Sequence, residues 1–213
     1  MNKRKRWIVM ATLFALAIPA LSAGQTAVET PNELPDYYNR GVEATNAGQW
    51  ADAAEAFRHA AVIDPSDADA HFQLGYAYRE LKRPMEAAEE FKEAARLSPD
   101  DGRPYFQLGW VNNELGKFAE ATEPLKQAVR LEPFDALAHS ELGYAYRNLK
   151  RYNEAITAYQ QAIRIDFNYA PAYHGLGVTY FAVGNSAAAQ EQYRILKSLD
   201  ADWAEKLSVA ISK

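Results

Sequence analysis

Apolar residues recur along the chain in two short helical stripes, and this pair of stripes repeats every 34 residues. The period is marked by five glycines: Gly41, Gly75, Gly109, Gly143 and Gly177. When each unit is numbered so that this glycine is position 8, the apolar residues at positions 4, 7 and 11 share one helical face, and those at positions 20, 24 and 27 share a second. Each unit is therefore predicted to be two amphipathic helices packed face to face.

Small residues stand where the two helices of a unit are expected to come closest. Position 20 is alanine in every unit: Ala53, Ala87, Ala121, Ala155 and Ala189. Small side chains at positions 8 and 20 let the helix backbones approach each other closely. Proline at position 32 of the first three units (Pro65, Pro99 and Pro133) ends the second helix, because proline cannot continue the helical hydrogen bonds.

This unit resembles that of the tetratricopeptide repeat (TPR) family, which has small residues at positions 8 and 20, bulky ones at 4, 7, 11 and 24, and proline at 32. The resemblance covers Leu34 to Trp203. It implies an all-α, right-handed superhelical solenoid of five helix-turn-helix repeats, at residues 34–67, 68–101, 102–135, 136–169 and 170–203. Stacking of neighbours is also expected on physical grounds, since one helix pair cannot bury both of its apolar faces alone.

The two ends of the predicted stack depart from the pattern. Arg40 replaces leucine at position 7 of the first unit, and the fifth unit lacks the proline at position 32. Beyond the fifth unit, Trp203, Leu207 and Ile211 recur at a spacing of four residues, which places them on one helical stripe. We therefore expect a C-terminal capping helix at residues 204–213.

The first 24 residues have the order of a secretory signal peptide. Basic residues 3–6 precede the apolar run from Trp7 to Leu21, and small residues follow at 22–24. An uncleaved membrane anchor is the alternative, but this run is shorter than the roughly 20 residues that span a bilayer, and it contains Pro19. We expect a signal peptide at 1–24, a polar linker at 25–33, and an exported protein in the periplasm or outside the cell.

Composition removes several classes of function. The chain has no cysteine, so disulfides, thiolate catalysis, thiolate metal sites and lipid attachment to an exported cysteine are excluded. Residues 1–24 hold four of the 23 basic residues and none of the 28 acidic ones, so the remainder carries a net charge of −9. This balance argues against nucleic acid or an anionic membrane as the main partner, and no stable membrane span is expected after signal cleavage.

No catalytic arrangement emerges from the spacing of the polar residues. His71 and His139 occupy position 4 of units 2 and 4, about 20 Å apart if adjacent helices are 8–10 Å apart, which is too far to share a proton or a metal. Asp64, Asp67 and Asp69 are interpreted as helix-capping residues rather than a calcium loop, which needs a glycine turn and a distant glutamate. The sequence therefore predicts a protein that is not an enzyme and has no cofactor or metal.

The family resemblance implies a concave groove lined by positions 2, 5, 9 and 12 of the first helices. The residues we predict to line it are Tyr38, Phe72, Tyr76, Arg79, Arg103, Phe106, Trp110, Asn113, Tyr144 and Arg147. Position 9 is usually a small polar residue in the family. Aromatic residues at this position in three consecutive units (Tyr76, Trp110 and Tyr144) predict a row of exposed rings, which is typical of a binding surface.

Three arginines face the predicted groove of a chain that is acidic elsewhere: Arg79, Arg103 and Arg147. Guanidinium groups beside aromatic rings suit carboxylates and planar groups. Two interpretations remain open. Either these arginines bind acidic groups of a partner, or they only pair with carboxylates of the fold such as Glu80, Glu114 and Asp69.

The clamp with which some members of the family grip a C-terminal carboxylate is absent. It needs lysine, asparagine and arginine at positions for which units 2 to 4 offer Phe72, Tyr76, Gln107, Leu137 and Glu141. We therefore predict a non-enzymatic interaction module that binds a peptide or helical segment of a cell-envelope partner with acidic and apolar or aromatic side chains. The alternative is a structural or assembly component that acts through stacking or through its convex face.

Overall fold

The computed structural model of the chain describes residues 34–212, and every element within that range is a helix. The first helices of the units are α1 (Leu34–Asn46), α3 (Ala68–Glu80), α5 (Gly102–Glu114), α7 (Ala136–Asn148) and α9 (Ala170–Ala182). The second helices are α2 (Trp50–Ile63), α4 (Pro84–Leu97), α6 (Phe118–Leu131), α8 (Tyr152–Ile165) and α10 (Ser186–Leu199), and α11 (Ala201–Ile211) follows. The predicted signal peptide and linker lie outside the described residues.

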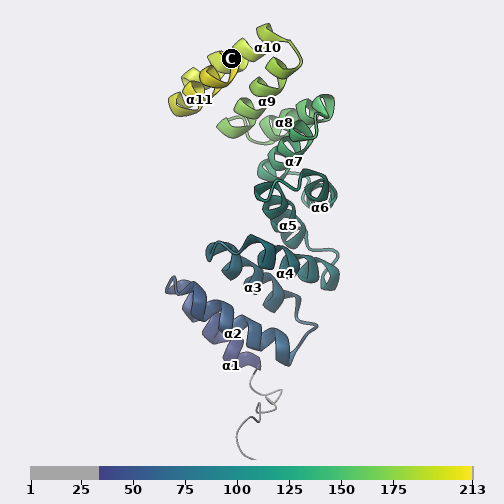
Figure 1. Cartoon of the computed structure of the whole chain (residues 1–213), viewed down its shortest axis with the longest axis vertical. Helices are drawn as coiled ribbons and strands as arrows, with labels where there is room; N and C mark the ends of the chain where they lie inside the picture. The colour runs from purple at the N-terminus through teal and green to yellow at the C-terminus, as the bar shows by residue number, and fades with distance from the viewer. Residues whose placement is uncertain (1–33, 213) are drawn as a thin grey trace, which may run out of the picture.

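The helices form a curved stack in which the first helices line the inner side and the second helices the outer side (Figure 1). Each helix packs against the next one along the chain, and the first helices of adjacent units also meet directly, as α5 does with α7 and α7 with α9. The hollow side of the curve opens between α3 and α11. The prediction of an all-α solenoid of five helix pairs with a C-terminal capping helix is confirmed.

The core of each unit is built on the small residues that mark the period. All five alanines at position 20 are fully buried or nearly so. In units 1 to 4 the glycines at position 8 lie so close to the second helix that a side chain would not fit without a shift: a Cβ added to Gly109 would lie 2.4 Å from Cγ of Leu125. Close approach of the two backbones therefore depends on these positions, as the sequence pattern predicts.

The connections between units change character along the chain. Asp67, Asp101 and Asp135, all at position 34, accept hydrogen bonds from the first backbone amides of α3, α5 and α7. The corresponding residue before α9 is Tyr169, whose side chain makes no such bond. Helix capping by aspartate is thus lost at the junction of units 4 and 5.

The turn inside each unit places one residue in the left-handed region of backbone conformation. Glycine occupies it in units 1, 3 and 5, and Gly48 has a φ of 71°. In units 2 and 4 the same position holds Lys82 and Lys150, each with a φ of 60°. A side chain in this conformation costs free energy, so these two turns are strained relative to the others.

The C-terminal helix covers the open end of the fifth unit. Leu207 is fully buried, and a Cβ added to Gly177 would lie 2.6 Å from its Cδ2 atom. The helix begins at Ala201, three residues before the expected range of 204–213. The earlier start follows from Asp200, whose carboxylate accepts hydrogen bonds from the amides of Asp202 and Trp203.

Candidate functional site

The aromatic residues at position 9 of the first helices are more buried than the sequence suggested. Tyr76 packs on Trp50 of the preceding unit with ring centroids 5.9 Å apart, and Tyr144 packs on Phe118 at 5.8 Å. Tyr76 and Trp110 are partly buried, and Tyr144 is 37% exposed. The predicted row of exposed rings is therefore exposed at Tyr144 and only partly exposed at Tyr76 and Trp110, because position 9 also packs neighbouring units together.

The aromatic residues predicted at position 5 belong to the edge of the core. The ring of Tyr38 meets Phe57 edge-on at 5.5 Å, and Phe72 meets Phe91 at 5.7 Å. Phe106 packs against the buried cluster of units 3 to 5. One side of each ring is thus occupied by the fold, and only the remainder is available to a ligand.

In units 2 and 3, position 12 reaches position 6 of the next unit. Arg79 Nη1 donates a hydrogen bond to Oε1 of Gln107 at 2.7 Å, and Asn113 Nδ2 donates to Oε2 of Glu141 at 2.9 Å. By the same spacing Arg147 meets Gly175, which has no side chain to accept a hydrogen bond. The residue pair at positions 12 and 6 therefore differs from one of these junctions between units to the next.

Arg79 is held by the protein on all sides. Besides its bond to Gln107, its Nη2 atom pairs with Oε1 of Glu80 at 2.7 Å. Its guanidinium carbon lies 4.2 Å from the ring centroid of Tyr76 and 5.1 Å from that of Trp110. The side chain is 18% exposed. For Arg79, the interpretation that it pairs within the fold is the right one.

Arg103 is also paired. Its Nη2 atom lies 2.7 Å from Oδ2 of Asp101 and 3.3 Å from Oδ1 of Asp69, and its guanidinium lies over the ring of Phe72. Burial alone would raise the pKa of Asp101, but hydrogen bonds from Arg103 hold it below its ordinary value. Asp101, which caps α5, and Asp69, in the first turn of α3, thus pair with this groove arginine.

Asn113 does not line the groove surface. It is 5% exposed, and its Nδ2 atom donates to the backbone oxygen of Glu141 as well as to its carboxylate. The amide oxygen of Asn113 is buried without a hydrogen-bond partner. The prediction that Asn113 faces a ligand is wrong, because its side chain fills the contact between α5 and α7.

Arg147 differs from the other predicted groove arginines. Its guanidinium lies 5.1 Å from the ring centroid of Tyr144, and within residues 34–212 its side chain makes no ion pair or hydrogen bond. It borders a cavity of about 230 Å³ between α7, α9 and α11. The lining residues are Ser140, Glu141, Tyr144, Arg147, Tyr159, Tyr169, Pro171, His174, Gly175 and Trp203.

Burial shifts the ionisable groups around this cavity. Burial raises the pKa of Glu141, whose carboxylate accepts the hydrogen bond from Asn113. Burial, followed by the charges of Arg147 and Lys206, lowers the pKa of His174 to about 4, so this imidazole is neutral at pH 7. Burial also raises the pKa of Tyr169 to about 12. Arg147 is thus a permanent positive charge beside neutral rings.

The sequence pattern predicted Tyr144 and Arg147 as site residues. It did not predict the residues from the following unit and the capping helix that complete the cavity. Tyr169 and Trp203 occupy position 34, where the earlier units have aspartate, so a change from aspartate to aromatic was the signal. His174 was noted only as standing alone at its position. A Cβ added to Gly175 would lie 2.3 Å from Cζ of Tyr159. Because glycine has no Cβ, the ring of Tyr159 can reach the cavity.

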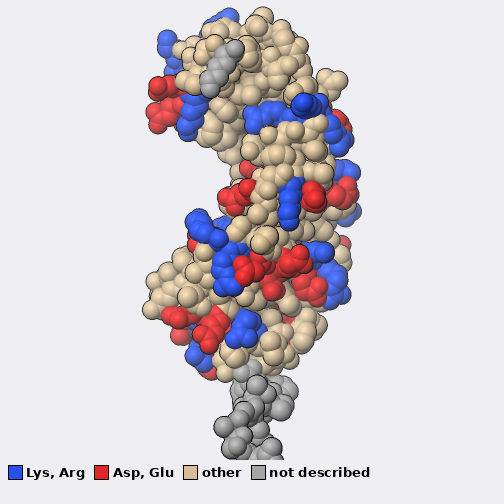
Figure 2. All heavy atoms as spheres, viewed as in Figure 1, with Lys and Arg blue, Asp and Glu red and all other residues tan. Residues whose placement is uncertain are grey.

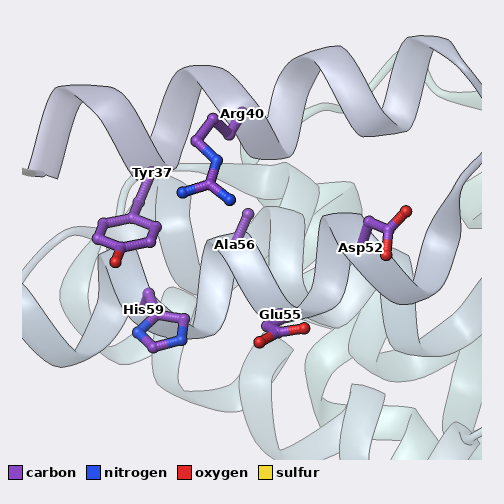
Figure 3. Close-up of a pocket in the computed structure, with 6 residues that line it drawn as sticks. All are labelled: Tyr37, Arg40, Asp52, Glu55, Ala56 and His59. Atoms are coloured by element: carbon purple, nitrogen blue, oxygen red, sulfur yellow. The ribbon is translucent and has the colours of Figure 1, made fainter. Parts of the chain in front are cut away.

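A second cavity, of about 260 Å³, lies between the two helices of the first unit (Figure 3). Arg40 extends from α1 towards α2, and Asp52 and Glu55 lie along the facing helix. The rings of Tyr37 and His59 stack 4.8 Å apart at its other end. Charges of both signs line this cavity, so it has no evident preference for a ligand of either charge.

Charged side chains are unevenly distributed over the face shown in Figure 2. Acidic side chains gather over α4, which carries Glu86, Glu89, Glu90 and Glu93, and side chains of both charges lie at the edge of the molecule near α11. Within the described residues, no helix has the length and apolar character needed to cross a membrane. The same part of the chain places no three His, Asp or Glu side chains together as metal ligands.

Three family profiles match most of the solenoid. Two profiles of the tetratricopeptide repeat match residues 38–102 and 102–135, and one described as TPR repeat matches residues 143–184. The chain belongs to the tetratricopeptide repeat family. TPR proteins bind protein or peptide partners, so this TPR chain is a scaffold for protein interaction.

Solved structures share the fold. MamA is 24% identical, with a TM-score of 0.76 over 82% of this TPR chain and 96% of its own. MamA from Desulfovibrio magneticus is 22% identical, with a TM-score of 0.76 over 80% and 97% of the two chains. YrrB, a TPR protein with an unusual peptide-binding site, is 25% identical, with a TM-score of 0.74 over 81% and 90%. No curated protein matches the sequence significantly.

Proposed function

We propose that the inner face of this TPR solenoid binds a peptide or helical segment of a cell-envelope protein, with acidic and apolar or aromatic side chains. The observation that carries the proposal is the cavity between α7, α9 and α11, whose walls are largely aromatic and which borders Arg147. Aromatic rings contribute binding free energy when a partner covers them, and a guanidinium binds carboxylates with charge-assisted hydrogen bonds. No catalytic role is proposed for any residue of the cavity.

Site-specific photocrosslinking tests whether the inner face is the working surface. A photoreactive phenylalanine analogue placed at Tyr144 should crosslink a partner in the cell envelope, and mass spectrometry then identifies that partner. The matched controls carry the same analogue at Met85 or Phe167, which are exposed on other faces. A partner crosslinked from residue 85 or 167 but not from residue 144 would contradict the proposal.

Export is part of the proposal and has its own test. The basic, apolar and small segments of residues 1–24 support cleavage near Ser22 to Gly24. N-terminal sequencing of the protein recovered from the envelope fraction should find a mature chain that starts at this point. Recovery of the intact N-terminus in a membrane fraction would favour an uncleaved anchor instead.

The alternative, an assembly role through another face, is favoured by exposed apolar residues away from the groove. Phe134 and Phe167 lie in successive loops between units and are 84% and 72% exposed. Met85, on the outer helix α4, borders a depression of about 540 Å³. Replacing Phe134 and Phe167 with serine should abolish concentration-dependent oligomers in light scattering if this second function is the right one.

A further inference from the structure

The capping helix contributes side chains to the cavity beside Arg147. Trp203 of α11 lines this cavity, and its ring lies 5.1 Å from that of His174. Lys206 Nζ lies 4.0 Å from the ring centroid of Trp203. A helix needed only to cover the last unit would do so through Leu207 and Ala204, which are buried.

Arg147 lacks the ion pairs that hold the other groove arginines, and Glu141, the acidic residue that lines the cavity, accepts its hydrogen bond from Asn113. Arg79 has Glu80 and Gln107, and Arg103 has two aspartates. The residues equivalent to Glu80 and Gln107 around Arg147 are Asn148 and Gly175, and Asn148 donates its own hydrogen bond to the backbone oxygen of Tyr144. The site is therefore short of acceptors for one guanidinium.

We infer that α11 is part of the binding site, and that the cavity takes the side-chain carboxylate of one aspartate or glutamate of the partner peptide. The carboxylate pairs with Arg147, and the apolar neighbour of that acidic residue lies against Tyr144 and Trp203. The inference rests on the proposed function and names the chemistry of one position in the bound peptide. It makes Arg147 and Trp203 residues that determine specificity.

The size of the cavity fits a side chain better than a separate small molecule. Sites for small ligands are usually about 300–1,000 Å³, whereas this cavity is about 230 Å³. One amino-acid side chain attached to a peptide that runs along the groove fills such a space. The rest of the peptide then lies over the partly buried rings of the earlier units.

An acidic side chain also fits better than the C-terminal carboxylate of a partner. The positions with which the family grips a terminal carboxylate hold Leu137 and Glu141 in unit 4. Neither residue supplies the positive charge with which such a clamp binds a terminal carboxylate. Arg147 lies one turn or more further along α7, where a side chain can reach it from the groove.

The test uses random dodecapeptides displayed on phage and selected on the purified protein. The enriched sequence should contain an aspartate or glutamate next to an apolar or aromatic residue. Changing that acid to its amide in a synthetic fluorescent peptide should raise the dissociation constant about ten-fold or more, as expected for the loss of one charge-assisted hydrogen bond. Arg147→Gln should weaken the original peptide to the same degree.

A double-mutant cycle gives the decisive measurement. The amide peptide should bind wild type and Arg147→Gln about equally, because each change removes the same contact. Arg147→Lys, which keeps the charge, should recover part of the affinity. Trp203→Ala should weaken binding about ten-fold, while the matched control Val209→Ala, on the exposed side of α11, should leave it unchanged.

The outcomes separate this inference from the proposed function. If Tyr144→Ser weakens peptide binding but Arg147→Gln does not, the proposal of a binding groove is supported. The proposed pairing of a peptide carboxylate with Arg147 is then refuted. If binding is lost when the C-terminus of the peptide is amidated, the side-chain assignment falls as well. If no peptide is enriched and residue 144 crosslinks nothing, the proposed function itself is overturned.

Discussion

The inner face of the solenoid has two halves that carry almost the same sequence and present different surfaces. Residues 71–83 and 139–151 match at ten of thirteen positions, including the arginines at 79 and 147. In the first half, Arg79 is enclosed by Gln107, Glu80 and two rings. In the second half, Arg147 borders an open cavity. The difference lies in one residue of the motif, where Glu80 gives way to Asn148, and in residues of the next unit, where Gln107 and Trp110 give way to Gly175 and Val178.

This comparison shows that a residue in a repeat protein takes its role from the next unit as well as from its own. The shared residues of the motif form the same helix in both copies. Whether the arginine is paired within the fold depends on the neighbouring residue, Glu80 or Asn148, and on the unit that stacks against it. The following experiments, in order of expected effect, break or sharpen the contrast.

The largest effect on stability is expected when the packing of α11 on the second half is weakened. Leu207→Ala leaves a cavity beside Gly177 and should reduce the free energy of unfolding by about 3 kcal/mol in urea denaturation. Hydrogen exchange should show faster opening in units 4 and 5 than in units 1 to 3, because each unit contacts only its neighbours. Val209→Ala is the exposed control on the same helix and should change little. Uniform loss of protection along the chain would mean that the two halves are not independent.

The two arginines should differ in their contribution to stability. Arg79→Ala removes the hydrogen bonds to Gln107 and Glu80 and the contacts with two aromatic rings, and should cost about 1–2 kcal/mol in the free energy of unfolding. Arg147→Ala removes one ring contact and should stay within about 0.5 kcal/mol of wild type. Equal costs in paired urea titrations would remove the distinction between a structural and an available arginine.

The second half should also be sensitive to acid. The folded pKa of His174 is about 4, below its ordinary 6.5, so its neutral form stabilises the fold at high pH and that stability is lost as the pH falls from 6.5 towards 4. Because the ring is partly exposed, the loss is expected to be only about 1 kcal/mol. His174→Phe should remove this part of the pH dependence, and His139→Phe should not.

The same titration tests the coupling between Arg147 and His174. Arg147→Gln should raise the pKa of His174 measured by NMR, since the guanidinium charge disfavours protonation of the ring. Arg79→Gln is the control, because its helix is three units away from His174. An unchanged His174 titration in Arg147→Gln would show that the two groups do not face the same cavity.

The smallest effect on stability is expected at the turns, which have the same backbone conformation in both halves. Lys82→Gly and Lys150→Gly relieve the left-handed conformation in equivalent turns. Each should stabilise the protein by about 0.5–1 kcal/mol, the strain relieved being partly offset by the greater freedom of glycine in the unfolded chain. A difference between the two in thermal unfolding would show that even the turns are not equivalent.

The sequence was sufficient for the fold because the fold depends on local rules that repeat. Glycine at position 8 and alanine at position 20 define close helix contacts, and five copies in phase leave little room for another architecture. The start of α11 was placed three residues late, because the pattern of Trp203, Leu207 and Ile211 marks a buried stripe and does not show that Asp200 caps the helix.

The candidate site was harder to predict because it is formed between units. Tyr144 and Arg147 were found from their positions on one helix. Asn113 was misplaced, since its burial depends on Glu141 of the next unit. Trp203 and Tyr169 reach the cavity from a position where aspartate caps the earlier helices, and the register alone assigns that position to a turn.

The packing of Leu207 against Gly177 has a thermodynamic consequence for ligand binding. In a one-dimensional array the terminal element has a single neighbour and therefore opens most often. Since α11 also forms a wall of the cavity, a ligand that needs Trp203 binds only the closed end and shifts the opening equilibrium towards it. Occupancy of the cavity then appears as slower amide exchange in α11, so this terminal helix reports whether a partner is bound.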